Sequence, residues 1–197
     1  MTATAWQVQS LLLDYPDEAL LGRVPLLRTA VATLPDAIGA PLPALLDHLE
    51  STPLTDLTAE YVATFDHRKQ FSPYLTYFVY GDTRKRGMAL LRFKHAYRAA
   101  GLVLDDAELP DHLAVVLEFA AVDPPAGRRL LIEYRAGLEL LRVGLREAGS
   151  PWAAVPESVS ATLPPLGRHV RDAVARLAAE GPPEEEVGLA PFGGGFS

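Results

Sequence analysis

The sequence predicts an all-α protein, a single-domain bundle of roughly seven to nine helices. Apolar residues recur at intervals of three and four along most of the chain, whereas the alternation typical of a half-buried strand is nearly absent. The 17 prolines fall mostly between these apolar stripes, where proline ends or begins a helix. A length of 197 residues suits one domain, and no fixed-period repeat indicates a solenoid.

The first helix is expected to begin at Thr4, which has the capping-box spacing with Gln7. It should end at Tyr15, because the residue before a proline is disfavoured in a helix. Apolar residues over 20–34 predict a second helix, in which Pro25 should cause a kink or a split because it lacks an N–H donor. These two helices make up the expected N-terminal part of the bundle.

Residues 35–43, which contain three prolines, are expected to form a connector. The apolar stripe over 54–65 predicts a third helix with Thr55 as its N-cap. The aromatic segment 71–80 is compatible with a strand, and equally with a helix or an extended turn.

Four further apolar stripes follow from residue 83 onward. Residues 83–100 predict a helix that stops at Gly101, and Pro110 is expected to open the next helix. The spacing over 131–145 predicts one long helix ending near Gly149. Leu166, Val170, Val174 and Leu177 mark the last helix.

Composition restricts the class of protein. Against 25 Asp and Glu there are 18 Lys and Arg, so the net charge of −7 argues against nucleic-acid binding. The absence of cysteine excludes disulfides and Cys-ligated metal sites, and no apolar run reaches the ~18 residues of a membrane span. The first residues lack the features of a secretory signal. We therefore expect a cytoplasmic protein with a helical domain over 1–180 and a disordered Pro/Gly/Glu-rich tail over 181–197.

Catalytic motifs are missing from the sequence. There is no GxSxG elbow, P-loop or GxGxxG, and no two histidines have the spacing of three or four residues that builds a metal site on a helix. We therefore expect neither catalytic nor metal-binding residues. A metal-dependent hydrolase that assembles Asp66, His67, Asp111 and His112 from separate segments is the less favoured alternative.

One candidate binding element is the sequence Glu108-Leu109-Pro110-Asp111-His112. Two carboxylates and an imidazole at the start of a helix could bind a partner's backbone or a polar ligand. The simpler interpretation is that Glu108 and Asp111 satisfy the free N–H groups and the dipole of that helix.

A second candidate is aromatic. The segment Tyr61-Val-Ala-Thr-Phe65-Asp66 is followed by a dense aromatic run, Phe71, Tyr74, Tyr77, Phe78 and Tyr80. Such a set suits a groove that accepts an amphipathic peptide, although burial in the core is the usual location of aromatic rings.

The third candidate is basic. Residues 82–101 carry six Lys and Arg against one acidic residue, a clear asymmetry in an acidic chain. Arg84, Arg86 and Arg92 could face an acidic or phosphorylated partner, or they could lie on a solvated helix face.

These features, in this order, resemble the NarJ family of nitrate reductase assembly chaperones, within the helical redox-enzyme maturation proteins that include the TorD and DmsD types. The resemblance covers residues 6–150. Its most specific stretches are YVATFD, YLTYFVYGDTRKRGMALL and AGLVLDDAELPDHLAVVLEF, and LLLDYPDE near the start also fits.

The resemblance implies a non-catalytic, TorD-like or NarJ-like helical chaperone. It would bind the N-terminal segment of the nitrate reductase α (catalytic) subunit and assist insertion of the molybdenum bis-guanine-dinucleotide cofactor into this client, without stably binding a cofactor itself. The candidate client-binding residues are Tyr61, Phe65, Asp66, Tyr77, Glu108, Pro110, Asp111 and His112. A monomer or weak dimer is expected, and a related chaperone for another molybdoenzyme is the main alternative.

Overall fold

The computed structural model describes residues 2–66, 69–104, 108–181 and 183, and within these ranges the protein is all-α. Twelve α-helices and two 3₁₀ turns, at Lys69–Phe71 and Pro151–Ala153, account for the regular structure of the described residues. The predicted fold class is confirmed. The expected seven to nine helices are too few because short helices were missed and one long helix is divided.

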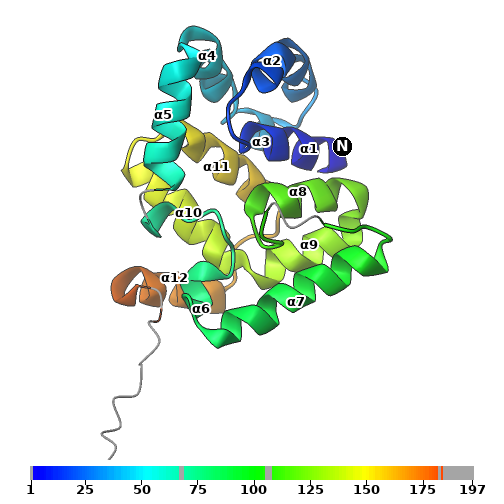
Figure 1. Ribbon diagram of the computed structural model, residues 1–197, viewed down its shortest axis with the longest axis vertical. Coiled ribbons are helices and arrows are strands. Elements are labelled where there is room, and N and C mark those ends of the chain that lie inside the picture. Colours follow the sequence, from blue (N-terminus) through cyan, green and yellow to red (C-terminus); the bar gives the residue numbers. More distant parts are fainter. Residues whose placement is uncertain (1, 67–68, 105–107, 182, 184–197) are drawn as a thin grey trace, which may run out of the picture.

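α10 (Arg135–Glu147) lies in the middle of the molecule, in contact with helices on several sides (Figure 1). Those neighbours are α6 (Tyr77–Tyr80), α9 (Pro124–Glu133), α11 (Ala154–Ala161) and α12 (Arg168–Glu180). α7 (Arg84–Ala99), α8 (Leu113–Val122) and α9 form the lower right of the view.

The N-terminal helices cover the upper part of the same bundle (Figure 1). α1 (Thr2–Leu12) packs against α8, α2 (Glu18–Val31) and α11. The remaining helices of this part are α3 (Asp36–Gly39), α4 (Pro43–Ser51) and α5 (Leu54–Phe65). A single large apolar core runs through both parts, because Trp6, Trp152 and Phe93 all belong to one cluster and are at most 1% exposed.

Glycines allow two close approaches in this core. A Cβ at Gly127 would lie 2.4 Å from the Cβ of Ala120, so α8 and α9 touch backbone to backbone. A Cβ at Gly137 would lie 2.2 Å from the carbonyl oxygen of Leu75. The second approach holds the segment that precedes α6 directly on α10, and this segment carries part of the candidate site.

Several helix boundaries differ from the sequence predictions. α1 starts at Thr2, so Thr4 is not its cap, and α2 continues through Pro25 without a split. The side chain of Asp17 caps α2 by accepting a hydrogen bond from the Leu20 N–H. Thr55 lies inside α5 and caps nothing, because the N-cap residue is Pro53.

Other differences concern whole elements. α4 begins within the expected connector at Pro43, and α11 was not anticipated. The expected long helix over 131–145 is two helices, α9 and α10, which meet at Tyr134. Pro110 does not open α8, whose N-cap is His112.

The described helices include none that is long and apolar enough to cross a membrane. Almost all of the predicted tail over 181–197 lies outside the described residues. The domain boundary near residue 180 therefore stays a prediction.

Candidate functional site

The Glu108–His112 segment lies against the aromatic segment that precedes α6. Tyr74 and His112 form an isolated antiparallel bridge. The Leu75 N–H donates to the carbonyl oxygen of Asp111 at 3.0 Å, and the Leu113 N–H donates to that of Pro73 at 2.9 Å. Two of the sequence candidates, the acidic element and the aromatic run, are thus joined through their backbones.

Asp111 is fully buried and does not cap α8, contrary to the simpler sequence interpretation. Its Oδ2 accepts hydrogen bonds from the backbone N–H of Thr76 at 3.1 Å and from the Thr76 hydroxyl at 2.5 Å. The carboxylate fixes the position of α6 relative to the Glu108–His112 segment. Its other oxygen, Oδ1, is buried and has no hydrogen-bond partner.

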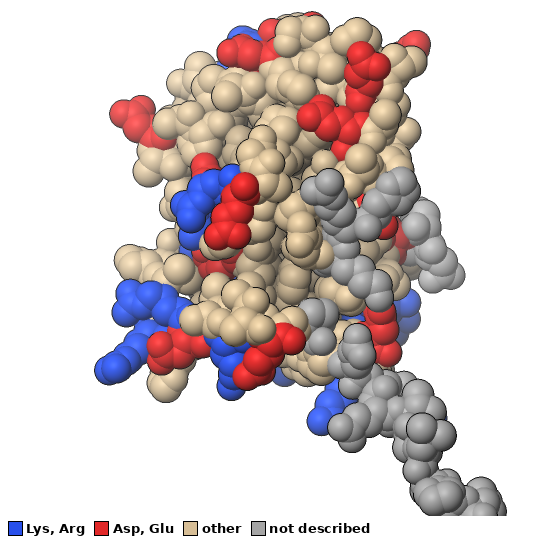
Figure 2. Space-filling view, turned by 90° about the vertical axis from the view of Figure 1, so that its left-hand side faces the viewer, with Lys and Arg blue, Asp and Glu red and all other residues tan. Residues whose placement is uncertain are grey.

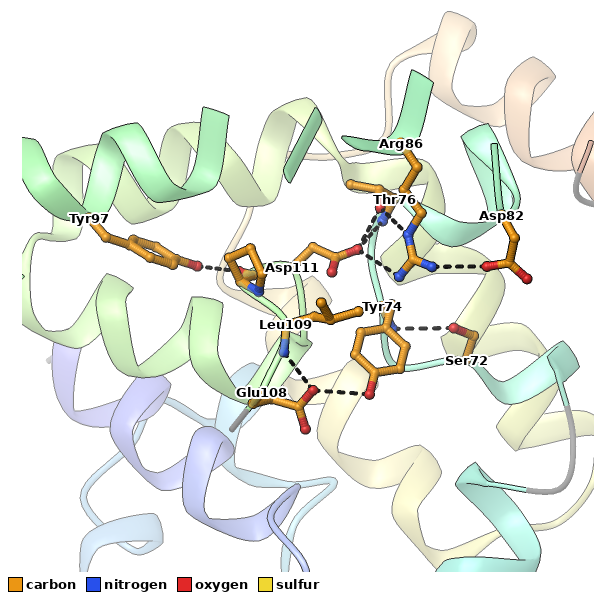
Figure 3. Close-up of polar contacts among 10 residues, drawn as sticks. Ser72, Tyr74, Thr76, Asp82, Arg86, Tyr97, Glu108, Leu109 and Asp111 are labelled. Atoms are coloured by element: carbon orange, nitrogen blue, oxygen red, sulfur yellow. Dashed lines mark hydrogen bonds and ion pairs between the residues drawn. The ribbon is translucent and has the colours of Figure 1, made fainter. Parts of the chain in front are cut away.

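Arg86 completes this buried network (Figure 3). Its Nε donates to the Thr76 hydroxyl at 3.1 Å, and its Nη2 lies 3.6 Å from Oδ2 of Asp111. Nη1 donates to Asp82 at 3.2 Å, and the guanidinium lies over the ring of Tyr74, 5.4 Å from its centroid. Of the three arginines considered as partner-facing, Arg86 is the one built into the interior.

Two tyrosines, Tyr74 and Tyr97, also bond to the Glu108–His112 segment (Figure 3). The Tyr74 hydroxyl donates to Oε1 of Glu108 at 3.0 Å, and the Tyr97 hydroxyl donates to the Pro110 carbonyl oxygen. Burial, followed by the charge of Glu108, raises the pKa of Tyr74 to about 12. The Tyr74 phenol therefore stays protonated and can donate to Glu108 at neutral pH.

His112 is the N-cap of α8. Its Nδ1 accepts a hydrogen bond from the Ala114 N–H at 3.2 Å, and its ring meets the ring of Tyr74 edge-on at 5.3 Å. Burial lowers the pKa of His112, against the opposing charges of Glu108 and Asp111. Because the lowered pKa favours the neutral ring and Nδ1 accepts, the proton of the imidazole is on Nε2.

A cavity of about 360 Å³ brings the two sequence motifs together. Its walls include Tyr61, Phe65 and Asp66 from the end of α5, and Glu108 and His112 from the segment before α8. Burial, followed by nearby carboxylates, raises the pKa of Tyr61, whose hydroxyl donates to the Leu13 carbonyl oxygen at 3.0 Å. The residues at the end of α5 are more than 40 positions from Glu108 and His112 in sequence, so the cavity forms only when the chain folds.

Sequence reasoning did not single out three other residues of this cavity. Asp14 and Tyr15 follow α1, and Glu118 lies on the outer face of α8. Tyr15 is 49% exposed and meets the ring of Tyr61 edge-on at 5.5 Å. The LLLDYPDE stretch already contained Asp14 and Tyr15, whereas nothing in the sequence distinguished Glu118 from other helix-surface acids.

The remaining candidates do not line this cavity. Tyr77 packs with Phe78 and Leu140 in a separate small cluster beneath α12. The side chain of Asp111 is directed to Thr76, away from the cavity. Arg84 and Arg92 lie exposed on α7, where Arg92 pairs with Glu133 at 3.1 Å.

Charges are unevenly distributed over the surface. On the face shown in Figure 2, most Lys and Arg side chains lie in the middle and lower parts, and the upper part carries mainly Asp and Glu. No group of three or more His, Asp or Glu within the described residues could hold a metal ion. His67, one of the four residues considered for a metal-dependent hydrolase, lies outside that part of the chain.

Comparisons with known proteins agree on one family. The model of the "Nitrate reductase delta subunit" family matches residues 32–155. The chain is 32% identical over 167 residues to a nitrate reductase molybdenum cofactor assembly chaperone, NarJ, of Bacillus subtilis, covering 84% of this chain and 90% of NarJ. It is 35% identical over 120 residues to NarJ of Escherichia coli, covering 59% of this chain and 51% of that protein.

Two further similarities concern a larger protein and a solved structure. The chain is 43% identical over 159 residues to the nitrate reductase-like protein NarX of Mycobacterium tuberculosis; the match covers 80% of this chain but only 24% of NarX. The crystal structure of a redox enzyme maturation protein from Archaeoglobus fulgidus is 26% identical, with a TM-score of 0.58 over 88% of this chain and 93% of that chain. Given a family match over most of the helical bundle and a NarJ relative aligned nearly end to end, this chain belongs to the nitrate reductase delta subunit family, together with the NarJ assembly chaperones.

Proposed function

We propose that this protein is a cytoplasmic, non-catalytic chaperone that binds the N-terminal segment of the catalytic subunit of a nitrate reductase. It would hold this client in a state that can receive its molybdenum bis-guanine-dinucleotide cofactor, and then dissociate. The similarity to NarJ chaperones supports the assembly role.

The observation that carries the peptide-binding part is the cavity between α5, α8 and the Glu108–His112 segment. It contains the aromatic motif and the acidic motif at once, and it has both apolar and hydrogen-bonding walls. Tyr61 and Phe65 form its apolar side, while Asp66, Glu108 and His112 supply polar groups. This mixture suits a short amphipathic segment, whose apolar side chains give affinity and whose polar groups give selectivity.

The buried Asp111–Arg86 network supports this assignment indirectly. It fixes the Glu108–His112 segment to α6 and α7, so the polar wall of the cavity is held in place before a client arrives. A preorganised wall reduces the entropy lost on binding. The affinity should nevertheless be moderate, since the client must be released.

Co-purification tests the proposal. Cells would express this chain with the nitrate reductase catalytic subunit, either intact or lacking its first ~15–20 residues, a helical length that can fill one groove. We expect capture of the intact subunit and not of the truncated one. Equal capture of both would refute binding of the N-terminal segment.

A pair of matched variants locates the contact. Tyr15→Ala removes a ring that is 49% exposed from the rim of the cavity, and Leu26→Ala removes a side chain that is 70% exposed from α2, outside the cavity. We expect Tyr15→Ala to reduce capture and Leu26→Ala to leave it unchanged. Capture of a dimethyl-sulfoxide-reductase-type subunit in preference to nitrate reductase would instead indicate the other client class.

A further inference from the structure

The cavity continues along α8 into a second, apolar groove of about 170 Å³. Val115 and Glu118 line both, and Val122 lines the groove one turn further along the helix. These three residues are separated by three and four positions, so they lie on one face of α8. α8 therefore forms a continuous floor with the cavity at its N-terminal end and the groove at its C-terminal end.

The cavity end is acidic. Asp14, Asp66, Glu108 and Glu118 lie in its walls, and none of the lining residues given by the structure is Lys or Arg. Within the described part of the chain, none of these four carboxylates makes an ion pair with a basic side chain. Among the described residues, the donors to Glu108 are neutral, namely the Tyr74 hydroxyl and the Leu109 N–H. Four carboxylates around one cavity, with no Lys or Arg among its described lining residues, favour a positively charged ligand.

His112 provides an independent indication that the cavity takes a ligand. The side chain is only 8% exposed, and its Nδ1 accepts from the Ala114 N–H. The proton is therefore on Nε2, for which the described residues provide no acceptor, while the ring lines the cavity. An N–H donor on the wall of the cavity, with no acceptor among the described residues, can donate to the carbonyl oxygen of a bound peptide.

The groove end has the opposite character. Leu102, Leu104 and Phe119 form its walls, and two of its aliphatic side chains, Val103 and Val122, are 91% and 60% exposed. Water-exposed aliphatic side chains next to a concave apolar surface indicate a place where a large apolar side chain is bound.

From this arrangement we infer that α8 carries a two-part recognition site for a client helix that places a Lys or Arg in the acidic cavity and a large apolar side chain in the groove. The inference rests on the proposed function and adds to it the chemistry and spacing of the recognised segment. Ala114 at the cavity and Val122 at the groove are eight residues apart, which corresponds to about 12 Å along a helix. Glu118, which lines both, is four residues or about 6 Å from Val122. A client helix lying beside α8 therefore has its basic and apolar anchors four to eight residues apart.

Peptide binding measured by calorimetry tests this inference. The probe is a synthetic peptide of the first 20 or so residues of the nitrate reductase catalytic subunit. A series of peptides replaces each Lys, Arg and large apolar residue by Gln, one at a time. On the protein side, Glu118→Gln reduces the charge of the cavity, and the double variant Val103→Gln, Val122→Gln makes the groove polar.

Matched control variants have the same chemistry elsewhere. Asp172→Asn removes an exposed carboxylate on α12, and Leu26→Gln with Met88→Gln replaces two apolar side chains that are 70% and 68% exposed. We expect Glu118→Gln to weaken the parent peptide about fivefold at low salt, as for other exposed charge pairs. The groove variant should weaken it about tenfold, and both controls should bind as the unchanged protein does.

Double-mutant cycles then decide the outcome. The inference predicts that one basic residue of the peptide is coupled to Glu118 and that one apolar residue is coupled to the groove variant. The two residues should be four to eight positions apart in the peptide. Couplings that are absent, or that fall at another separation, overturn the inference but leave the proposed function intact if the parent peptide binds. Failure of the parent peptide to bind the unchanged protein would instead refute the proposed function.

Discussion

Two buried carboxylates of this protein have very different surroundings. Glu139 on α10 is 1% exposed, and both of its oxygens are bonded: Oε1 to Arg135 at 2.7 Å and to Ser160 at 2.8 Å, and Oε2 to Arg142 at 2.7 Å. Asp111 is also fully buried, but only its Oδ2 is bonded, and Oδ1 has no hydrogen-bond partner. The first network is complete and the second is not.

The difference follows from where each network lies. Arg135 joins α10 to the end of α11 by donating to Ser160 as well as to Glu139, so the complete network is part of the framework of the bundle. The network of Asp111 and Arg86 lies directly behind the candidate site, and each of the two residues leaves one buried polar atom without a hydrogen bond. Incompletely bonded buried groups cost stability, so they are expected where position matters more than stability.

Glu139→Ala should cause the largest loss of stability. It leaves the guanidinium of Arg135 buried without its carboxylate, and breaking one partner of a buried ion pair typically costs about 3–5 kcal/mol. Urea denaturation followed by circular dichroism measures the change in the free energy of unfolding. A loss below about 1 kcal/mol would show that Ser160 and solvent replace the carboxylate, and that the two networks do not differ as described.

Asp111→Asn should have a smaller effect on stability. The amide oxygen can still accept from Thr76, while the attraction to Arg86 is lost, so we expect about 1–2 kcal/mol. The same substitution should weaken client-peptide binding, because the Glu108–His112 segment loses its fixed position relative to α6. The comparison predicts the opposite pattern for Glu139→Gln, which should lower stability and leave peptide affinity unchanged in protein that is still folded. Equal effects of both variants on affinity would contradict it.

The contrast between the networks also explains what could be predicted from the sequence. The helical stripes were readable because they depend on local spacing: Leu113, Val116 and Leu117 are all buried on α8 as expected. The role of Asp111 was misread, because its partner Thr76 is 35 positions away and a nearby helix N-terminus offered a local explanation. For the same reason Glu118 was not recognised, since its significance depends on which segments fold next to it.

Helix boundaries were limited by similar non-local effects. The stripe over 131–145 continues across Tyr134, where the chain leaves α9 and enters α10, because packing keeps the same apolar residues buried on both sides of the break. Pro25 remains within α2, whose buried residues Leu20, Val24, Leu27 and Val31 keep the helix on the core. In both cases tertiary packing outweighed a local signal.

Tyr74→Phe tests the link between the incomplete network and the cavity. It removes the hydroxyl that donates to Glu108 and retains the ring beneath Arg86, so the expected cost is about 1 kcal/mol in the free energy of unfolding. Tyr97→Phe removes a comparable hydroxyl, bonded to the Pro110 carbonyl, from the other side of the segment and serves as a control. We expect Tyr74→Phe to change peptide affinity more than Tyr97→Phe does, since Tyr74 and its acceptor Glu108 line the cavity, whereas Tyr97 and its acceptor Pro110 do not.

The smallest expected effect is a dependence of stability on pH. His112 beside the cavity and Glu139 on α10 should change stability over different pH ranges. Burial lowers the pKa of His112 below its ordinary 6.5, although Glu108, Asp111 and Asp14 oppose the shift. The unfolded chain therefore takes up a proton near pH 6.5 that the folded chain does not, and stability present above this pH decreases as the pH falls below it.

For Glu139 burial acts to raise the pKa, but the hydrogen bonds from Arg142, Ser160 and Arg135 outweigh it and lower the pKa below 4.5. Its contribution is present above pH 4.5 and is lost only as the pH falls through the lowered value.

Measurements between pH 5.5 and 8 consequently report on His112 and not on Glu139. His112→Gln should flatten the decrease in the free energy of unfolding over this range, whereas Glu139→Gln should shift the whole curve downward without changing its shape. Peptide affinity measured over the same range shows whether protonation of the ring also affects the client, because a charged imidazole loses Nδ1 as an acceptor for the Ala114 N–H. A pH profile identical in His112→Gln and the unchanged protein would mean that the imidazole is not the titrating group, and that the part of the protein next to the cavity is no more sensitive to pH than the α10 framework.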